Sequence, residues 1–564
     1  MERIYGKTGG LKASHIKSLQ NLYRRRVAGN QVISHELSRQ LSAVSSEMER
    51  QVALLISRKG EVSFVVVGDD RRIEIPDLGR FRSGTGRLRG LRCIHTHLKG
   101  EGLSREDLTD LVLLGLDLMV SVEVNEGGIP GPISYAHILP EKRGTEGWSI
   151  SRVSDIGQLD VDFHELIQSL ENELARTSGT TRLEKKERAI LVGVTEGQTW
   201  KAKESLEELR DLAVSNNLEV IDVVIQRVSK ANPRFLIGKG KLSELVLRCL
   251  QTGSNLLIFD HELTPAQVRS LTDATEMRII DRSQLILDIF ARRAVTREGK
   301  IQVELAQLKY LLPRLATKNT AMSRLTGGIG GRGPGETKLE INRRRARERI
   351  ARLNREWEAI RVQREDRRKL RNSRKTPVVS IVGYTNAGKS TLLNHLTHSK
   401  VTVEDRLFAT LDPSSRRLRF PREREIIITD TVGFIRDLPA DLMKAFAATL
   451  EELNDADLLL HVVDSSSPRM EEQIKTVEGI LEKLELRMIP TLLVLNKIDR
   501  VQSGEVQALA RAYKGIPISA IDPQTFKPLL ERMEKLLWPG HAILPQDKNV
   551  EDEAREEPDA GTIV

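Results

Sequence analysis

The segment VVSIVGYTNAGKSTLLNHL, residues 378–396, constrains the fold of this chain more than any other segment. A run of β-branched residues is followed by Gly383-x-x-x-x-Gly388-Lys389-Ser390 and then by a helical pattern, which is the strand, loop and helix order of a P-loop. The glycines let successive backbone amides point at phosphate oxygens, Lys389 reaches the β- and γ-phosphates, and Ser390 ligates magnesium. The segment therefore predicts an α/β nucleotide-binding domain.

Two further segments carry residues that can sense a γ-phosphate. The strand-like REIIITD ends in Asp430, which is placed to hold magnesium through a water, and the amide of Gly433 can bond the γ-phosphate. Thr410, in the loop LFATLDPSSRRL, can ligate magnesium and bond the γ-phosphate, so that this loop is ordered only with GTP bound. An ordinary polar loop residue is the alternative interpretation of Thr410.

The base is predicted to be guanine. The apolar strand IPTLLVLNKID ends in Asn496-Lys497-Ile498-Asp499, and PISAI supplies Ser519 and Ala520 to back the base. A carboxylate at Asp499 can accept from both N1–H and the 2-amino group of guanine, whereas adenine offers neither donor.

Taken together, these segments give a full set of predicted nucleotide contacts. The predicted GTP-binding residues are Gly383, Tyr384, Thr385, Asn386, Ala387, Gly388, Lys389, Ser390, Thr391, Phe408, Ala409, Thr410, Leu411, Asp412, Asp430, Thr431, Val432, Gly433, Asn496, Lys497, Ile498, Asp499, Ser519, Ala520 and Ile521. Lys389, Thr410 and Gly433 are the predicted catalytic residues, and Ser390, Thr410 and Asp430 are the predicted magnesium ligands, Asp430 through a water.

Upstream, short apolar runs alternate with helical patterns between residues 188 and 296, which predicts a small parallel α/β domain. Within it, FLIGKGKLSEL pairs glycines with Lys239 and Lys241 ahead of a helix. A phosphate-facing loop for RNA or a nucleotide and a tight turn with solvated lysines explain this segment equally well. Whether ATP binds near Lys239 is left open.

Residues 297–374 are predicted to form an antiparallel two-helix hairpin with a glycine-rich tip, TGGIGGRGPGE. The first apolar seam is Ile301, Leu305, Leu308, Leu312 and Leu315, and the second is Ala346, Ile350, Leu353, Trp357 and Ile360.

The positive charge of the chain is concentrated in this hairpin. Between Lys338 and Lys375 there are 16 Lys and Arg against 6 Asp and Glu, so the segment carries 16 − 6 = +10, more than the +9 of the whole chain. An arginine-rich helix beside a glycine-rich tip suits RNA phosphates. The alternative is an ordinary solvated helix face. The predicted RNA-binding residues are Arg332, Lys338, Arg343, Arg344, Arg345 and Arg347.

The motifs GYTNAGKST, FATLDP, DTVGFIRDLP and NKID resemble the G domain of the HflX family, translation-associated bacterial GTPases related to Obg. The resemblance extends upstream to NPRFLIGKGKLSEL and GGIGGRGPGETKLE, and covers about residues 188–540. The departures are small, such as Gly331 and Lys338 where the family pattern has threonine and glutamine. The resemblance implies binding to the large ribosomal subunit, with the hairpin tip reaching toward the peptidyl-transferase region and the subunits driven apart.

A phenylalanine, Phe434, follows Gly433. Many small GTPases have at this place a glutamine that orients the attacking water, and GTPases without assistance are very slow. HflX proteins similarly carry a hydrophobic residue here. We therefore expect a docked ribosome to order the catalytic loops, with Phe434 either part of a hydrophobic switch or simply packed under the loop.

Residues 1–180 lie outside that resemblance and contain CIHTHLKGEGLSREDL. His95-x-His97 followed by Ser104-x-x-Asp107 resembles the metal motif of the JAB/MPN (JAMM) metalloproteases, with RadC-type proteins a close comparison. The resemblance implies an α+β MPN-like domain with zinc on His95, His97 and Asp107 and water in the fourth position. Glu49, just before the strand-like QVALLIS, matches the place of the general base.

The motif departs from the family pattern at two places. Six rather than seven positions separate His97 from Ser104, and Leu98 replaces the usual proline. These departures bear on catalysis more than on the fold. The alternative interpretation is two surface histidines beside a helix cap formed by Ser104 with Asp107.

Composition sets the broad class. The chain is 30% charged and 4% aromatic, no apolar run approaches the roughly 20 residues that span a bilayer, and the two cysteines, Cys93 and Cys249, suit a reducing compartment. We therefore expect a cytoplasmic protein without a membrane span, a monomer, with Mg²⁺ and possible Zn²⁺ as cofactors. The predicted domains are 1–180, 188–296, 297–374 and 376–540, the last a P-loop G domain, with a disordered acidic tail at 541–564.

The predicted function is a GTPase that associates with the large (50S) ribosomal subunit and splits or rescues ribosomes. Two alternatives are a GTP-gated RNA-binding or ribosome-assembly factor, and a GTP-regulated zinc isopeptidase acting through the first domain.

Overall fold

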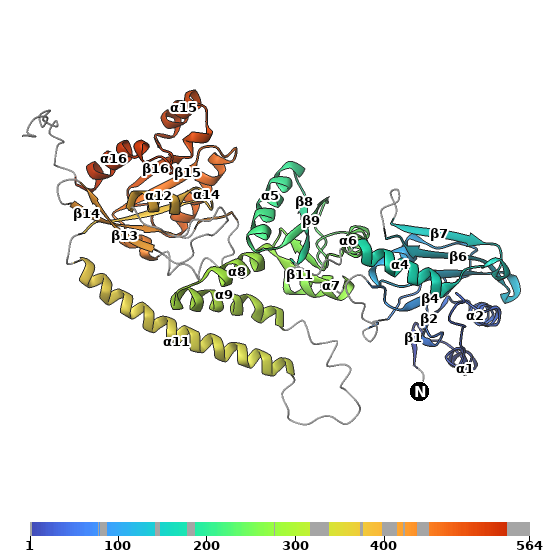
Figure 1. The fold of residues 1–564 in the computed structure, drawn as a ribbon. Coiled ribbons are helices and arrows are strands. Elements are labelled where there is room, and N and C mark those ends of the chain that lie inside the picture. Colours follow the sequence, from blue (N-terminus) through green and yellow to red (C-terminus); the bar gives the residue numbers. More distant parts are fainter. Residues whose placement is uncertain are drawn as a thin grey trace, which may run out of the picture. The chain divides into compact units, whose positions relative to one another are not determined.

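The structure is a computed structural model (Figure 1). It describes residues 3–76, 78, 87–140, 147–177, 186–275, 277–315, 338–372, 376–397, 414–420, 424–431, 433–436 and 451–538. The chain divides into two compact units, with the main boundary along the sequence between Ile360 and Arg361. Of the helices in the described ranges, none is both long and apolar enough to cross a membrane. The glycine-rich tip at 326–336 and the tail at 541–564 lie outside the described residues.

The first domain is built on a seven-stranded mixed sheet with the order β1-β3-β2-β4-β5-β6-β7. The strands are β1 (Ile4–Gly6), β2 (Val52–Ser57), β3 (Val62–Val67), β4 (Leu91–His97), β5 (Leu118–Val124), β6 (Pro130–Ile138) and β7 (Trp148–Val153). The helices are α1 (Ala13–Leu22), α2 (His35–Met48), α3 (Arg105–Leu113) and α4 (Phe163–Thr177), with short 3-10 turns at Glu126–Gly128 and Ile156–Gln158. β1 pairs with β3 and β4 pairs with β5 in parallel, while the other pairs are antiparallel.

Strand β4 lies at the centre of this sheet and is buried along its whole length. Successive side chains of a strand point to opposite faces. The Thr96 hydroxyl lies 2.7 Å from that of Ser45 on α2, whereas His95 faces Asp107 on α3. Helices therefore cover both faces, which explains why every residue of the strand is buried.

The second domain has a four-stranded parallel sheet with the order β11-β10-β8-β9, as predicted for residues 188–296. Its elements in chain order are β8 (Arg188–Thr195), α5 (Thr199–Ser215), β9 (Glu219–Arg227), α6 (Lys239–Thr252), β10 (Leu256–Phe259), α7 (Pro265–Thr275), β11 (Arg278–Asp281) and α8 (Arg282–Arg293).

Two helices follow, α9 (Arg297–Leu315) and α11 (Lys338–Asn372). Their predicted seams meet, since Ile301, Leu305 and Leu353 form one buried cluster with Leu308, Ile350, Trp357 and Ile360 packed against it. Arg349 on α11 also makes two hydrogen bonds to the carboxylate of Glu304 on α9, at 2.6 and 2.7 Å. The two helices therefore pack as the sequence predicted.

The last domain has a six-stranded sheet with the order β13-β14-β12-β15-β16-β17, in which β13 alone pairs antiparallel. The strands are β12 (Val378–Gly383), β13 (Ser414–Phe420), β14 (Arg424–Asp430), β15 (Leu458–Asp464), β16 (Thr491–Asn496) and β17 (Ile516–Pro517). The helices are α12 (Lys389–Thr397), α14 (Met470–Lys483), α15 (Ser503–Tyr513) and α16 (Lys527–Leu537), with 3-10 turns at Glu451–Asp455, Ile498–Arg500 and Pro523–Phe526. The predicted motifs follow the carboxyl ends of β12, β14 and β16, where ligands bind in open α/β sheets.

Candidate nucleotide site and metal centre

The loop between β12 and α12 has the backbone conformation of a phosphate-binding loop. Gly383 has φ +153°, and a Cβ there would lie 2.2 Å from the carbonyl oxygen of Val462. Gly388 has φ +91°, and a Cβ there would lie 2.3 Å from the side-chain nitrogen of Asn496. Both positions therefore require glycine, as the motif predicted.

Lys389 is the first residue of α12, and its Nζ donates to the carbonyl oxygen of Tyr384 at 2.8 Å. The side chain is buried, and burial lowers the pKa of Lys389 to about 8. The negative charge of Asp430 acts in the opposite direction and raises this pKa. Phosphate oxygens at this loop would favour the charged form of the amine. The predicted phosphate contact of Lys389 is thus consistent with its position.

The predicted magnesium ligands lie together. The hydroxyl of Ser390 donates to Oδ2 of Asp430 at 2.6 Å, and Asp430 is fully buried at the end of β14. A hydroxyl and a carboxylate oxygen are ligands that Mg²⁺ prefers, so this pair fits the ion, which neutralises phosphate charge when bound. The other predicted contacts Phe408, Ala409, Thr410, Leu411, Asp412 and Val432 lie outside the described residues.

The guanine-binding segments converge on the P-loop. Asn496 donates through Nδ2 to the carbonyl oxygen of Ala387 and accepts from the amide of Ala520, both at 2.8 Å. The hydroxyl of Ser519 donates to Asp499 at 2.5 Å, and the Asp499 carboxylate is exposed where a base would stack. Asn496 therefore links the phosphate-binding loop to the predicted base-binding loop, and Ser519 orients the Asp499 carboxylate.

Phe434 is buried, with 2% of its surface exposed. Its amide donates to the carbonyl oxygen of Gly383 at 3.1 Å, and its carbonyl oxygen accepts from the amide of Thr385 at 2.8 Å. The hydroxyl of Tyr384 further accepts from the amide of Arg436 at 2.9 Å. The burial of Phe434 fits both a hydrophobic switch and plain packing, and the segment that follows the DTVG motif is hydrogen-bonded directly to the P-loop.

Sequence analysis missed two residues near this site. Asp464 ends β15 and forms an ion pair with Lys497 at 2.8 Å, which fixes the guanine motif. His461 is buried in the middle of β15, where burial and the charge of Lys389 lower the pKa of His461 to about 4. A polar residue inside the apolar run LLLHVVD, and an acid at its end, were the signals available in the sequence.

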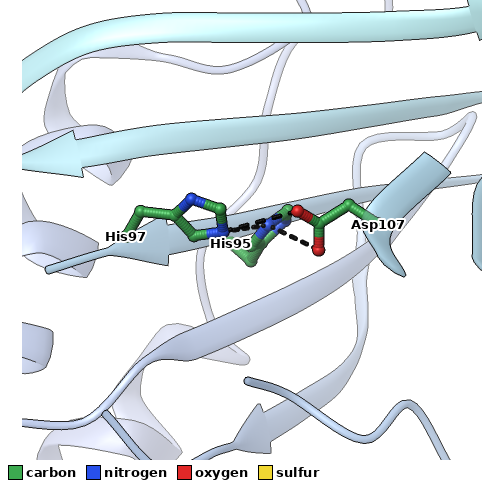
Figure 2. Close-up of side chains that lie close together, drawn as sticks. All are labelled: His95, His97 and Asp107. Atoms are coloured by element: carbon green, nitrogen blue, oxygen red, sulfur yellow. Dashed lines mark hydrogen bonds and ion pairs between the residues drawn. The ribbon is translucent and has the colours of Figure 1, made fainter. Parts of the chain in front are cut away.

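In the first domain, strand β4 and helix α3 bring His95, His97 and Asp107 together (Figure 2). The two Nε2 atoms lie 2.9 Å apart, and the Asp107 carboxylate oxygens lie 3.3 Å from His95 Nε2 and 3.5 Å from His97 Nε2. Ligands about 2.0–2.1 Å from a tetrahedral zinc are separated by about 3.4 Å. Each of the three side chains thus offers a ligand atom within 4.8 Å of the other two, close enough to bind one ion together, and among the described residues no other group of three or more His, Cys, Asp and Glu does so.

Neighbouring contacts hold these side chains in place. His97 Nδ1 lies 2.9 Å from the carbonyl oxygen of Glu101, and a proton on Nδ1 donates a hydrogen bond to this oxygen. In that tautomer Nε2 carries no proton, so its lone pair can bind a metal. Asp107 accepts from the amide and hydroxyl of Ser104, each at 2.7 Å, and completes a capping box at the start of α3. Burial opposes ionisation, yet His95 and Ser104 hold the pKa of the Asp107 carboxyl well below its usual range. The cap and metal interpretations of Asp107 are therefore compatible.

The predicted general base, Glu49, is less well placed. It is exposed at the C-terminus of α2, with a left-handed backbone at φ 52°. Strand β2 pairs antiparallel with β4, with Ala53 opposite His95, so the chain before β2 lies toward the His97 end of β4. Glu49 thus follows the correct strand order, but its carboxylate is not part of the buried cluster.

The predicted RNA-binding arginines lie on α11. Arg344, Arg345 and Arg347 are exposed, and Arg343 is partly buried. Lys338 begins the helix, but its side chain, like the whole of Arg332, lies outside the described residues.

A mostly parallel sheet with a P-loop, a hydroxyl and carboxylate pair suited to magnesium, and an acid at the predicted guanine position are the features of a P-loop GTPase. Three family models match in order: "GTP-binding GTPase N-terminal" at residues 203–291, "GTP-binding GTPase Middle Region" at 293–371 and "50S ribosome-binding GTPase" at 378–497. None of these three segments includes the group of His95, His97 and Asp107.

Curated relatives name the family. The chain is 49% identical over 356 residues to GTPase HflX of Caldanaerobacter subterraneus subsp. tengcongensis, covering 63% of this chain and 81% of the relative. It is 45% identical over 354 residues to GTPase HflX of Escherichia coli K12, covering 62% and 83%. The chain belongs to the HflX family and is a GTP-hydrolysing enzyme. Among solved structures, a GTP-binding protein from Sulfolobus solfataricus in complex with GDP is 27% identical, with a TM-score of 0.36 over 63% of this chain and 99% of that one.

Proposed function

We propose that the large ribosomal subunit orders the catalytic loops of this GTPase, and that the enzyme uses GTP to split or rescue ribosomes. The observation that carries the proposal is the buried Phe434, which occupies the place of a water-orienting glutamine and is bonded to the P-loop through its own backbone. Because a phenylalanine cannot orient water, we assign this task to an outside surface. The match to a 50S ribosome-binding GTPase model supports the large subunit as that surface.

The hairpin supports an RNA partner. Arg344, Arg345 and Arg347 are exposed within about one turn of α11, and Arg349 bonds to Glu304 on α9 and so stabilises the hairpin. Exposed arginines can neutralise RNA phosphates and release counterions. We place the enzyme in the cytoplasm as a monomer with Mg²⁺, where ribosomes are available.

The GTP hydrolysis rate, measured alone and with purified large subunits at fixed salt, tests this proposal. We expect a rise of about a hundredfold or more, within the range that trans-acting activators give. In the double variant Arg345→Glu, Arg347→Glu, the ratio of the GTP hydrolysis rate with large subunits to the rate without them should fall. The dependence of this ratio on salt should also weaken, because fewer RNA phosphates are neutralised. If large subunits leave the rate of GTP hydrolysis unchanged, activation by the ribosome is rejected. Stimulation without dissociation of paired subunits would favour the alternative, a GTP-gated RNA-binding or assembly factor.

A second function is favoured by the His95, His97 and Asp107 group. We propose that these residues hold a zinc ion in an MPN-like domain, with a water in the fourth position and Glu49 as the base for hydrolysis of a peptide or isopeptide bond. The support is the convergence of two Nε2 atoms and one carboxylate, whose ligand atoms lie within 4.8 Å of one another. Zinc there would lower the pKa of its water toward neutrality.

Metal content of the purified chain tests the zinc site. We expect about one zinc per chain, lost in His95→Ala and retained in the matched control His164→Ala, an exposed histidine on α4. Glu49→Gln should keep the zinc and abolish any peptidase activity, because the base would be lost while the ligands remain. A folded chain without zinc, purified in the presence of zinc, would reject the metal centre.

A further inference from the structure

Helix α6 (Lys239–Thr252) belongs to two hydrophobic cores at once. Its residues Leu242, Leu245 and Cys249 pack in the core of the four-stranded sheet of its own domain. On another face Val246, Leu247 and Leu250 are 3%, 7% and 8% exposed and belong to the core of the first domain. The helix therefore joins the HflX α/β domain to the domain that carries the histidine pair.

The contact between these two domains is close. A Cβ on Gly147 of the first domain would lie 1.9 Å from Cδ2 of Leu247, so the backbone of Gly147 packs directly against this side chain. Near the end of α6, Gln251 donates through Nε2 to the carbonyl oxygen of Leu139 at 2.9 Å. Helices α3 and α4 of the first domain both pack on α6. Apolar packing, backbone approach and a hydrogen bond thus all fix the helix on the first domain.

Helix α3 (Arg105–Leu113) lies between the metal-binding group and α6. Its first turn supplies Asp107 to the histidines of β4, and its last residue, Leu113, packs against the core of the α/β domain as well as its own. Between them lies Asp110. Burial raises the pKa of Asp110 to about 6, and the positive charge of Lys239 at the start of α6 opposes this rise. A single short helix therefore supplies one of the proposed metal ligands and also packs against α6.

We propose that a metal ion on His95, His97 and Asp107 acts as a clamp that fixes α3 on β4 and thereby stabilises α6 and the Gly238–Lys241 segment at its start. This inference rests on the proposed metal centre. It assigns to that centre a regulatory effect on the GTPase-family part of the chain, in addition to any hydrolytic activity.

The physical basis is that the ion would cross-link two elements that otherwise meet through side chains alone. A helix of 9 residues is marginal by itself, so α3 depends on its contacts for stability. The free energy of metal binding becomes folding free energy for the elements that the ligands fix. Because coupling between two sites is reciprocal, disturbing α6 must weaken metal binding by the same factor.

Hydrogen exchange of the full-length chain, zinc-loaded and after chelation, tests the clamp. We expect amides of α3 and of α6 (Lys239–Thr252) to exchange at least about tenfold faster without zinc. Amides of α12 in the G domain serve as the internal reference and should not change. The variant Asp107→Asn should reproduce the effect of the chelator, with no further change when the chelator is added.

The reciprocal measurement uses a matched pair of substitutions in the α/β domain. Leu247→Ser, on the face of α6 that enters the first domain, should weaken zinc binding by about tenfold. Leu206→Ser, equally buried but on α5 against the sheet of its own domain, should not weaken it. If either variant fails to fold, the exchange comparison on the wild-type chain decides alone.

The outcomes separate the clamp from the metal centre on which it rests. Bound zinc with unchanged exchange in α6 would overturn the clamp and leave the metal centre intact, as would a response confined to α3. A chain that binds no zinc would overturn both. Neither result would bear on ribosome-stimulated GTP hydrolysis, which is measured separately.

Discussion

Replacing Lys389 by alanine is expected to lower the rate of GTP hydrolysis by about a thousandfold or more, because the variant loses a buried charge aimed at the β- and γ-phosphates. In the structure the Lys389 amine is buried, bonds to the carbonyl oxygen of Tyr384, and lies 3.0 Å from where a Cβ on Gly433 would be. Single-turnover hydrolysis at saturating GTP, with and without large ribosomal subunits, measures the loss.

A matched control is Lys475→Ala, which removes the same charge from an exposed ion pair with Glu471 on α14. Its hydrolysis rate should stay within about twofold of the wild type, since exposed pairs contribute little. Thermal unfolding of both variants checks that the Lys389→Ala chain is folded. Turnover by Lys389→Ala near the wild-type rate would show that the phosphate site is wrongly assigned.

The nucleotide site was predictable because its chemistry demands fixed residues at fixed spacing. Gly383 and Gly388 adopt backbone angles and approaches that exclude a side chain, so the glycines of the motif are imposed by local geometry. Asp430 and Asn496 each end a buried apolar strand, and parallel strands place their carboxyl ends at one edge of the sheet. The contacts between the strands thus follow from the fold class.

The features that the sequence did not predict depend on contacts between residues that lie far apart in the chain. The two-sided packing of α6 was not predicted, because its sequence shows which residues are apolar but not which core each one enters. The exposure of Glu49 was not predicted either, since a match in chain order does not fix where a side chain points. The bonding of Phe434 to Gly383 and Thr385 uses backbone atoms, which leave no trace in residue type.

Replacing Asp499 by asparagine is expected to weaken GTP binding by about 10⁴-fold and to shift preference toward xanthine nucleotides. The carboxylate accepts two hydrogen bonds from guanine, and a site built for such bonds rejects a partner that leaves polar groups unpaired by roughly 10⁴–10⁵. Asparagine presents an N–H where guanine also has one, whereas xanthine has a carbonyl oxygen there. Affinities for GTP and XTP, measured on both proteins, test this expectation.

High affinity of the Asp499→Asn variant for XTP is the internal control, because a variant that binds xanthosine triphosphate well must be folded around its base site. Ser519, which donates to Asp499, can still donate to the asparagine oxygen, so the loop that backs the base should keep its place. Asn496 is untouched and continues to brace Ala387 against Ala520. XTP-dependent hydrolysis stimulated by large subunits would then show that guanine recognition and ribosomal activation are separate properties of this fold. Unchanged GTP affinity would instead place base recognition on other residues.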